Sequence, residues 1–262
     1  MADHFKSKYR VVIACLPDFD KTDVPSRKQG WRVEEVDAAL DETIARAAPG
    51  KADRVTLVIH DWGCFYGYRY LSRHPEKVSK LVAMDIGAAA RSSGGKDRPL
   101  FRASVQIAKL TIYQLWFAAC FVIGNVLGYG VGDAVLFLFF AIARVTGFFG
   151  PGTFSAGARP FSEIHCWQGY CYYYVWRKIL FEGEKPRMPY PKDTPMLYMY
   201  GADKHLMFHS DAFLERAKSS GGMASVRPFR GGHWFYRDDH DGVVEAMEAF
   251  LEGRPVPEKY PA

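Results

Sequence analysis

The sequence lacks several features that mark specialised classes of protein. Its 34 basic and 29 acidic residues leave a net charge of only +5, and they form no long basic stripe or tail, so nucleic-acid binding is not expected. The first residues are polar without an apolar core, which predicts no cleavable signal peptide. No cysteine pair has C-x-x-C spacing, so no redox motif or zinc site is predicted, and no other metal or cofactor is expected. Reduced thiols of a cytoplasmic protein are the expected state of Cys15, Cys64, Cys120, Cys166 and Cys171.

What is present is typical of an α/β protein. The 262 residues are 48% hydrophobic and 24% charged, as in an ordinary globular chain. Short apolar runs alternate with segments of helical periodicity, and this order predicts a parallel sheet with right-handed crossovers. The predicted strands are residues 10–15, 54–59, 78–84, 195–200 and 224–229.

The middle of the chain departs from this pattern. We expect residues 1–90 and 190–262 to form the core and residues 91–189 to form an inserted helical lid. No charged residue occurs from Leu110 to Gly132, and a second apolar run extends from Asp133 to Ala143. A run of this length could contact or cross a bilayer, but a helical hairpin packed on a protein core would look the same. A substrate-facing lid and membrane contact through residues 110–143 therefore both stay open.

Three polar residues fall at or shortly after the ends of predicted strands. They are Asp61, Asp203 and His233, and the carboxyl ends of parallel strands are where α/β proteins bind ligands. An acidic or nucleophilic residue, then an acid, then a histidine is also the chain order of the α/β-hydrolase triad. This order predicts a catalytic centre at that edge of the sheet.

The sequence around Asp61 resembles one branch of that superfamily. The segment Val58-Ile-His-Asp-Trp-Gly-Cys64 and the following Tyr70-Leu-Ser-Arg-His-Pro-Glu-Lys-Val78 resemble the nucleophile elbow and first helix of epoxide hydrolases and haloalkane dehalogenases. The G-H-D-W-G elbow of the epoxide hydrolases is the closer match. Segments near the carboxyl terminus, Met207-Phe-His-Ser210 and Gly232-His-Trp234, are similar to the same family.

The resemblance implies a covalent mechanism. Asp61 would attack a carbon electrophile of an apolar small molecule and form an ester, and His233 would activate water to hydrolyse that ester. A carboxylate would orient His233: Asp203 by its position, or Asp85 as the alternative. The alternative arises because the family usually places this acid one residue further along, where the chain has Lys204.

The resemblance also assigns substrate-binding residues. The amide of Trp62 would form part of an oxyanion hole. The aromatic segment 167–176 falls where the lid tyrosines of epoxide hydrolases donate hydrogen bonds to the epoxide oxygen. Residues on one helix cannot all face one pocket, and Tyr172 and Tyr173 are the predicted donors. Aromatic packing between lid and core is the alternative role for these side chains.

The sequence departs from the family in two places. It contains no His-Gly-x-Pro oxyanion loop, and the strand before that loop would lie between residues 10–15 and 54–59. In addition, Ile59 stands where the elbow usually has glycine. Two hypotheses therefore remain open: an epoxide hydrolase-like enzyme, or a catalytically impaired relative that binds an apolar ligand or a membrane. The oligomeric state is not predicted.

Overall fold

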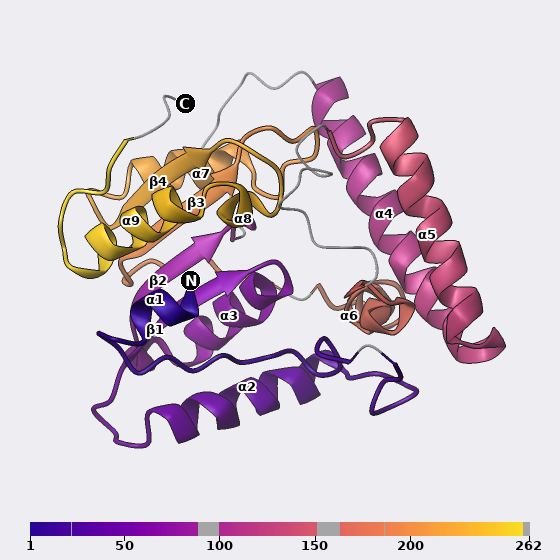
Figure 1. Ribbon diagram of the computed structural model, residues 1–262, viewed down its shortest axis with the longest axis horizontal. Helices are drawn as coiled ribbons and strands as arrows, with labels where there is room; N and C mark the ends of the chain where they lie inside the picture. Colours follow the sequence, from indigo (N-terminus) through magenta and orange to yellow (C-terminus); the bar gives the residue numbers. More distant parts are fainter. Residues whose placement is uncertain (22, 89–99, 151–162, 186, 259–262) are drawn as a thin grey trace.

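A parallel sheet of four strands is the centre of the computed structural model, which describes residues 1–21, 23–88, 100–150, 163–185 and 187–258 (Figure 1). The strands lie in the order β1, β2, β3, β4, and every neighbouring pair is parallel. They are β1 (Val55–His60), β2 (Val78–Met84), β3 (Met196–Gly201) and β4 (Ala224–Phe229). The predicted α/β class and four of the five predicted strands are therefore confirmed.

The fifth prediction, a strand at residues 10–15, is wrong. These residues belong to no sheet, and Val11, Val12 and Ile13 are 40%, 49% and 77% exposed. A β-branched run forms a strand only where a neighbour completes its hydrogen-bond ladder. Among the described residues no strand lies on the outer side of β1: the run at 10–15 does not pair with it, and β1 is an edge strand.

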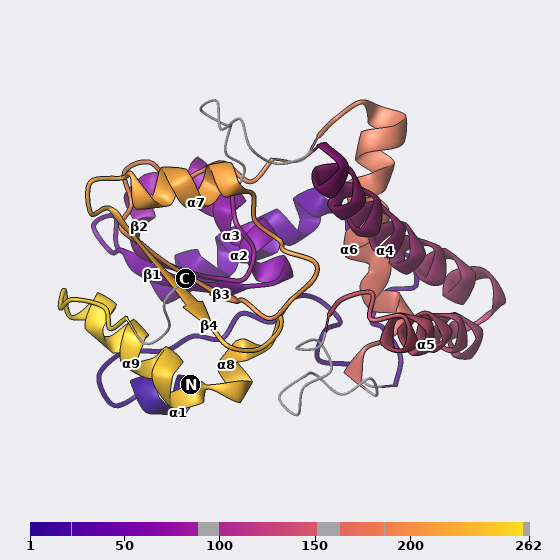
Figure 2. The ribbon, with the colours of Figure 1, turned by 90° about the horizontal axis from the view of Figure 1, so that it is seen from above.

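Helices cover both faces of the sheet (Figure 2). One face packs against α2 (Val33–Ala47), α3 (Trp62–Arg73) and α7 (Asp211–Lys218), and the other against α1 (Ala2–Phe5), α8 (Phe235–Asp238) and α9 (His240–Leu251). Strand β2 shows the expected alternation, because Leu81 and Ala83 join the first core while Val82 and Met84 join the second. The short 3₁₀ helix η1 (Pro75–Lys77) connects α3 to β2.

Between β2 and β3 the chain leaves the sheet and forms a group of helices that we call the insertion. Its members are α4 (Leu100–Leu127), α5 (Tyr129–Val145), the 3₁₀ turn η4 (Cys166–Gly169), α6 (Tyr170–Arg177) and the π-helical turn η5 (Lys178–Glu182). The arrows of β1 and β2 point toward it (Figure 1). The long apolar segment is thus a hairpin of α4 and α5 that packs on α6 and η4, not a helix extending alone.

Two glycines let the hairpin close around a buried thiol. A Cβ atom placed on Gly124 or on Gly132 would lie 2.6 Å from Sγ of Cys166, so no larger side chain fits at either position. All five cysteines are free thiols, and all but Cys15 are buried. Gly124 and Gly132 therefore serve helix packing.

Candidate active site

Asp61 sits at the sharp turn between β1 and α3. Its φ of 52° and ψ of −127° are strained for a residue other than glycine, and such strain is typical of a side chain held exposed at a functional turn. Although Asp61 is the N-cap residue of α3, its carboxylate caps no amide. The side chain is 32% exposed and faces a cavity, so a purely helix-capping role does not describe it.

The elbow accommodates Ile59 through a glycine on the next helix. Ile59 is 7% exposed, and a Cβ atom on Gly67 of α3 would lie 2.6 Å from its Cγ2 atom. The small residue required for close helix–strand contact is thus Gly67 on the helix, and not a glycine on the strand. Ile59 is therefore compatible with an intact turn.

His233 lies in the loop after β4 and links two carboxylates. Its Nε2 atom is 3.6 Å from Oδ2 of Asp61, and its Nδ1 atom is 2.5 Å from Oδ2 of Asp85. Asp85 follows β2 directly, has a positive φ of 70°, and its side chain is completely buried. The structure thus brings Asp61, His233 and Asp85 together at the carboxyl edge of the sheet.

Asp203 is not part of this group, and the predicted contact between it and His233 is wrong. Its carboxylate is exposed and accepts a hydrogen bond from the amide of Gly231 at 2.8 Å, which fixes the loop that leads to His233. The next side chain, Lys204, turns inward instead, and its Nζ donates to Oδ1 of Asp85. The chain thus places a cation where the family usually places its acid.

The charges of this group depend on one another. Burial raises the pKa of Asp85, but Lys204 and His233 outweigh burial and hold it well below its usual range. Burial likewise raises the pKa of Asp61, and His233 brings it below its usual value. For His233, burial lowers the pKa, whereas the two carboxylates raise it to about 9. Asp61 is thus ionised near neutral pH, and the free site favours a protonated His233.

His60 holds the loop that carries His233 in position. Its Nε2 atom donates to the backbone oxygen of His233 at 2.9 Å, and the two rings lie 4.4 Å apart. Burial, together with the nearby charge of His233, lowers the pKa of His60 to about 4. A neutral His60 therefore positions His233 and is not itself a base.

A cavity of about 130 Å³ opens between this group and the insertion. Its walls are mainly aromatic and include Trp62, Tyr113, Phe117, Phe149, Tyr172 and Phe208. Cavities of roughly this size hold one benzene-sized ring. The lining favours an apolar ligand, with Asp61 and His233 as the polar groups at one end.

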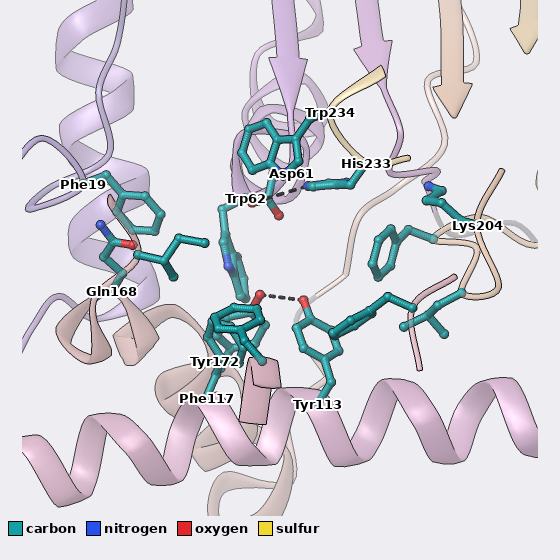
Figure 3. A pocket seen from close by; sticks show the side chains of 15 residues that line it. Phe19, Asp61, Trp62, Tyr113, Phe117, Gln168, Tyr172, Lys204, His233 and Trp234 are labelled. Atoms are coloured by element: carbon teal, nitrogen blue, oxygen red, sulfur yellow. Dashed lines mark hydrogen bonds and ion pairs between the residues drawn. The ribbon is translucent and has the colours of Figure 1, made fainter. Parts of the chain in front are cut away.

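Two tyrosines face Asp61 from the insertion. The hydroxyls of Tyr113 on α4 and Tyr172 on α6 are 2.5 Å apart, and Figure 3 shows them on the side of the cavity opposite Asp61 and His233. Burial raises the pKa of both hydroxyls, so both stay protonated and can donate. The ring of Trp62 meets that of Tyr172 edge-on at 4.7 Å.

The predicted donors are thus only partly where the sequence suggested. Tyr172 lines the cavity, but Tyr173 does not: its ring packs against Phe121 at 5.3 Å. Tyr113 was missed because it belongs to the uncharged run that was interpreted as apolar throughout. Its hydroxyl, one of the few polar groups in that run, was the available signal.

One side of the elbow is open. The Trp62 amide is in the first turn of α3, where backbone N–H groups have no partner within the helix. A Cβ atom on Gly63 would meet no atom within 4 Å. Within the part of the chain that the structure describes, the helix end is therefore the evident source of oxyanion donors.

Comparisons with known proteins agree with this architecture. Residues 1–106 match the family model described as the alpha/beta hydrolase fold. Over 57 residues the chain is 35% identical to cis-3-alkyl-4-alkyloxetan-2-one decarboxylase of Shewanella oneidensis, covering 22% of this chain and 16% of that protein. Over 83 residues it is 31% identical to epoxide hydrolase 3 of Xenopus tropicalis, covering 32% and 22%.

Solved structures extend the match to most of the chain. NosK from Streptomyces actuosus aligns over 96% of this chain and 89% of its own, with a TM-score of 0.55 and 15% identity. A point mutant of an epoxide hydrolase from Bacillus megaterium, in complex with its product (R)-3-[1]naphthyloxy-propane-1,2-diol, aligns over 88% of this chain and 79% of its own, with a TM-score of 0.53 and 18% identity. At such identities these structures show the fold alone.

Sheet, elbow and matches together define a protein of the α/β-hydrolase fold. The curated proteins that match segments of the chain include epoxide hydrolases, and one is the human epoxide hydrolase 4, 28% identical over 82 residues. The matched segments span about a sixth to a fifth of the curated relatives' own length.

Proposed function

We propose that the protein is a hydrolase that opens epoxides of apolar small molecules through a covalent ester on Asp61. The observation that carries the proposal is the geometry around Asp61. Its backbone is strained, its carboxylate caps no helix amide, His233 lies beside it, and two protonated tyrosines lie across an aromatic cavity. The insertion then acts as a lid, because it supplies the tyrosines and much of the apolar wall.

The first step is ring opening. A carboxylate oxygen of Asp61 attacks an epoxide carbon, the carbon–oxygen bond of the ring breaks, and the released alkoxide takes a proton from Tyr113 or Tyr172. Asp61 suits this role because its lowered pKa keeps it ionised without a base. The hydrogen bond between the tyrosines holds both donors near one point, which favours the developing charge on oxygen.

The second step is hydrolysis of the ester. Esterification removes the negative charge of Asp61, one of the two groups that raise the pKa of His233. His233 therefore loses its proton more readily, and this proton restores the tyrosinate left by ring opening. The neutral ring can then act as a base, with Asp85 fixing its orientation. It takes a proton from water, which attacks the ester carbonyl carbon, and gives that proton to the departing diol oxygen as the intermediate collapses. The acid form of Asp61 then passes its proton to His233, which restores the carboxylate.

The site provides more catalytic groups for ring opening than for ester hydrolysis. Ring opening has its nucleophile and two proton donors, whereas the oxyanion of the second step faces an open side near Gly63. A missing donor of this kind costs on the order of a hundredfold in rate. We therefore expect the ester to accumulate during turnover.

An oxygen-labelling experiment tests the mechanism. Single turnover of a simple aryl epoxide in heavy-oxygen water should place one label in the peptide that contains Asp61. His233→Gln should form the ester and retain it, and Asp61→Ala should form neither ester nor diol, while Asp203→Ala serves as the matched carboxylate control. Label found only in the diol, with Asp61→Ala still active, would exclude the covalent route.

A four-membered ring is a second candidate substrate. The decarboxylase matched above is named for an oxetan-2-one, which is also a strained cyclic oxygen electrophile. The same Asp61 geometry would serve either ring size. Assaying both substrate classes with wild type and Asp61→Ala separates them, and absence of Asp61-dependent turnover with either would favour the catalytically impaired hypothesis.

A further inference from the structure

The outer face of the hairpin formed by α4 and α5 is exposed and apolar along its length. Its members include Ile107, Ile112, Val126, Leu127, Leu138 and Ile142, which are between 50% and 74% exposed. Single exposed apolar residues are normal on a protein surface, but a continuous apolar face marks a contact site. This face therefore requires an explanation.

The face also lacks charge. No charged residue lies between Lys109 and Asp133 or between Asp133 and Arg144. Asp133 is held inside the insertion, where its carboxylate accepts from the amide of Cys166 at 2.6 Å and contacts Nδ1 of His165 at 3.0 Å. A helix pair of this length in water would normally carry charges on its outer side.

The inner face of the hairpin is already occupied. Tyr113 and Phe117 of α4 and Phe140 of α5 line the cavity, and α4 packs on α6 and η4. Figures 1 and 2 both place α4 and α5 on the flank of the molecule away from the sheet. The segment Val105–Leu127 is apolar and long enough to cross a membrane, yet only 28% of its most apolar window is buried. A core helix of the same hydropathy would be mostly buried.

We propose that this outer face docks on a lipid surface. Stable protein interfaces use tyrosine, tryptophan and arginine and form about one hydrogen bond per 100–200 Å². Here the aromatic residues with polar groups, Tyr113 and Trp116, face inward, with Trp116 donating to the backbone oxygen of Val135. The outer residues named above are aliphatic, the exposed Phe137 is also apolar, and none of them offers a hydrogen-bonding side chain, which hydrocarbon does not require. The exposed Arg144 at the base of the hairpin complements lipid phosphate groups.

The hairpin thereby connects two environments. One side of the same helix pair would contact lipid while the other side lines the cavity beside Asp61. An apolar substrate dissolved in the membrane would then meet the cavity wall without crossing bulk water. The docking itself does not depend on the chemistry proposed for Asp61.

Vesicle flotation with the full chain tests the docking. Wild type should float with phosphatidylcholine vesicles, more strongly with anionic phosphatidylglycerol added, and should stay bound in high salt because the contact is apolar. The variant Val126→Glu/Leu138→Glu/Ile142→Glu should lose at least about tenfold in vesicle affinity, since three exposed apolar groups no longer enter hydrocarbon.

A charge-matched control separates docking from a general effect of added carboxylates. Ile13, Val24 and Phe181 are 77%, 57% and 82% exposed and lie outside the hairpin, so Ile13→Glu/Val24→Glu/Phe181→Glu should still float. Thermal melting should show that both triple variants fold. Wild type that fails to float, or a control that loses binding as fully, overturns the proposal. Concentration-dependent dimerisation of a non-floating wild type would assign the face to a second copy of the chain.

Discussion

Lys204 and Asp85 form a buried ion pair directly behind His233. The Asp85 side chain is completely buried and that of Lys204 is 2% exposed, so water reaches neither charge appreciably. Asp85 divides its two oxygens between this lysine and Nδ1 of His233. Burial lowers the pKa of Lys204, but the carboxylate opposes this. The strength of the His233–Asp85 bond is therefore set partly by Lys204.

Replacing Lys204 should change the basicity of His233. In Lys204→Met, Asp85 has only His233 as a cationic partner, so the pKa of His233 should rise above about 9 and ester hydrolysis near neutral pH should slow. An NMR titration of the imidazole measures this shift. Lys204→Arg keeps the charge and should stay nearer wild type, and Lys80→Met, which removes a lysine bonded to the Phe250 oxygen, is the control. An unchanged His233 pKa in Lys204→Met would contradict the coupling.

The two aspartates considered for the orienting role should differ sharply. Asp85→Asn leaves His233 without its carboxylate partner, and we expect turnover to fall by roughly a thousandfold or more. Asp203→Asn should remain within about threefold of wild type, because its carboxylate bonds the Gly231 amide rather than His233. Steady-state rates on one epoxide compare them. Equal losses would show that the loop held by Asp203 matters as much as the acid.

The tyrosine pair should act on ring opening and not on ester hydrolysis. Tyr113→Phe and Tyr172→Phe each leave one donor and should slow ester formation by roughly tenfold, and the double variant by about a hundredfold or more. Stopped-flow measurement of ester formation gives these rates. Tyr173→Phe, a neighbour that packs on Phe121 outside the cavity, should behave as wild type. Slower ester hydrolysis with normal formation would assign the pair to another role.

The contact between Ile59 and Gly67 should affect the free energy of unfolding. Gly67→Ala places a Cβ atom 2.6 Å from Ile59 Cγ2, and such overpacking costs about 1–3 kcal/mol of unfolding free energy. Combining it with Ile59→Ala should cost less than the two single changes added together, because the clash is then absent. Urea unfolding of all four proteins measures the coupling. Strict additivity would mean that the helix and strand do not compete for this space.

The strands could be predicted where a local pattern suffices. Predicted residues 78–84 and 224–229 coincide with β2 and β4, since each run is bounded by polar or turn-forming residues. The run at 10–15 has the same composition but pairs with no strand among the described residues, and pairing depends on residues far away in the sequence. Composition predicts that a segment can form a strand, but the strand forms only where a neighbouring strand pairs with it.

The site was predictable by position but not by side-chain direction. Asp61 and His233 follow strands and do meet, as the chain order suggested. Asp85 and Asp203 also follow neighbouring strands, and no local signal tells which carboxylate turns inward; a positive φ and a lysine partner decide for Asp85. Tyr173 and Tyr113 differ in which face of their helix meets the cavity, which depends on how the insertion packs.

The uncovered edge of β1 has a consequence for handling the protein. Parallel strands are normally covered on both sides, but Val58 at the centre of β1 is 45% exposed. From Val55 to His60 the strand carries no proline, lysine or acidic residue, the usual gatekeepers of a free edge. Because no strand of the described residues pairs with this edge, its amides and carbonyls are a template on which strands of other molecules can align. Self-association through this edge, rather than loss of the fold, would then limit the concentration at which the protein stays in solution.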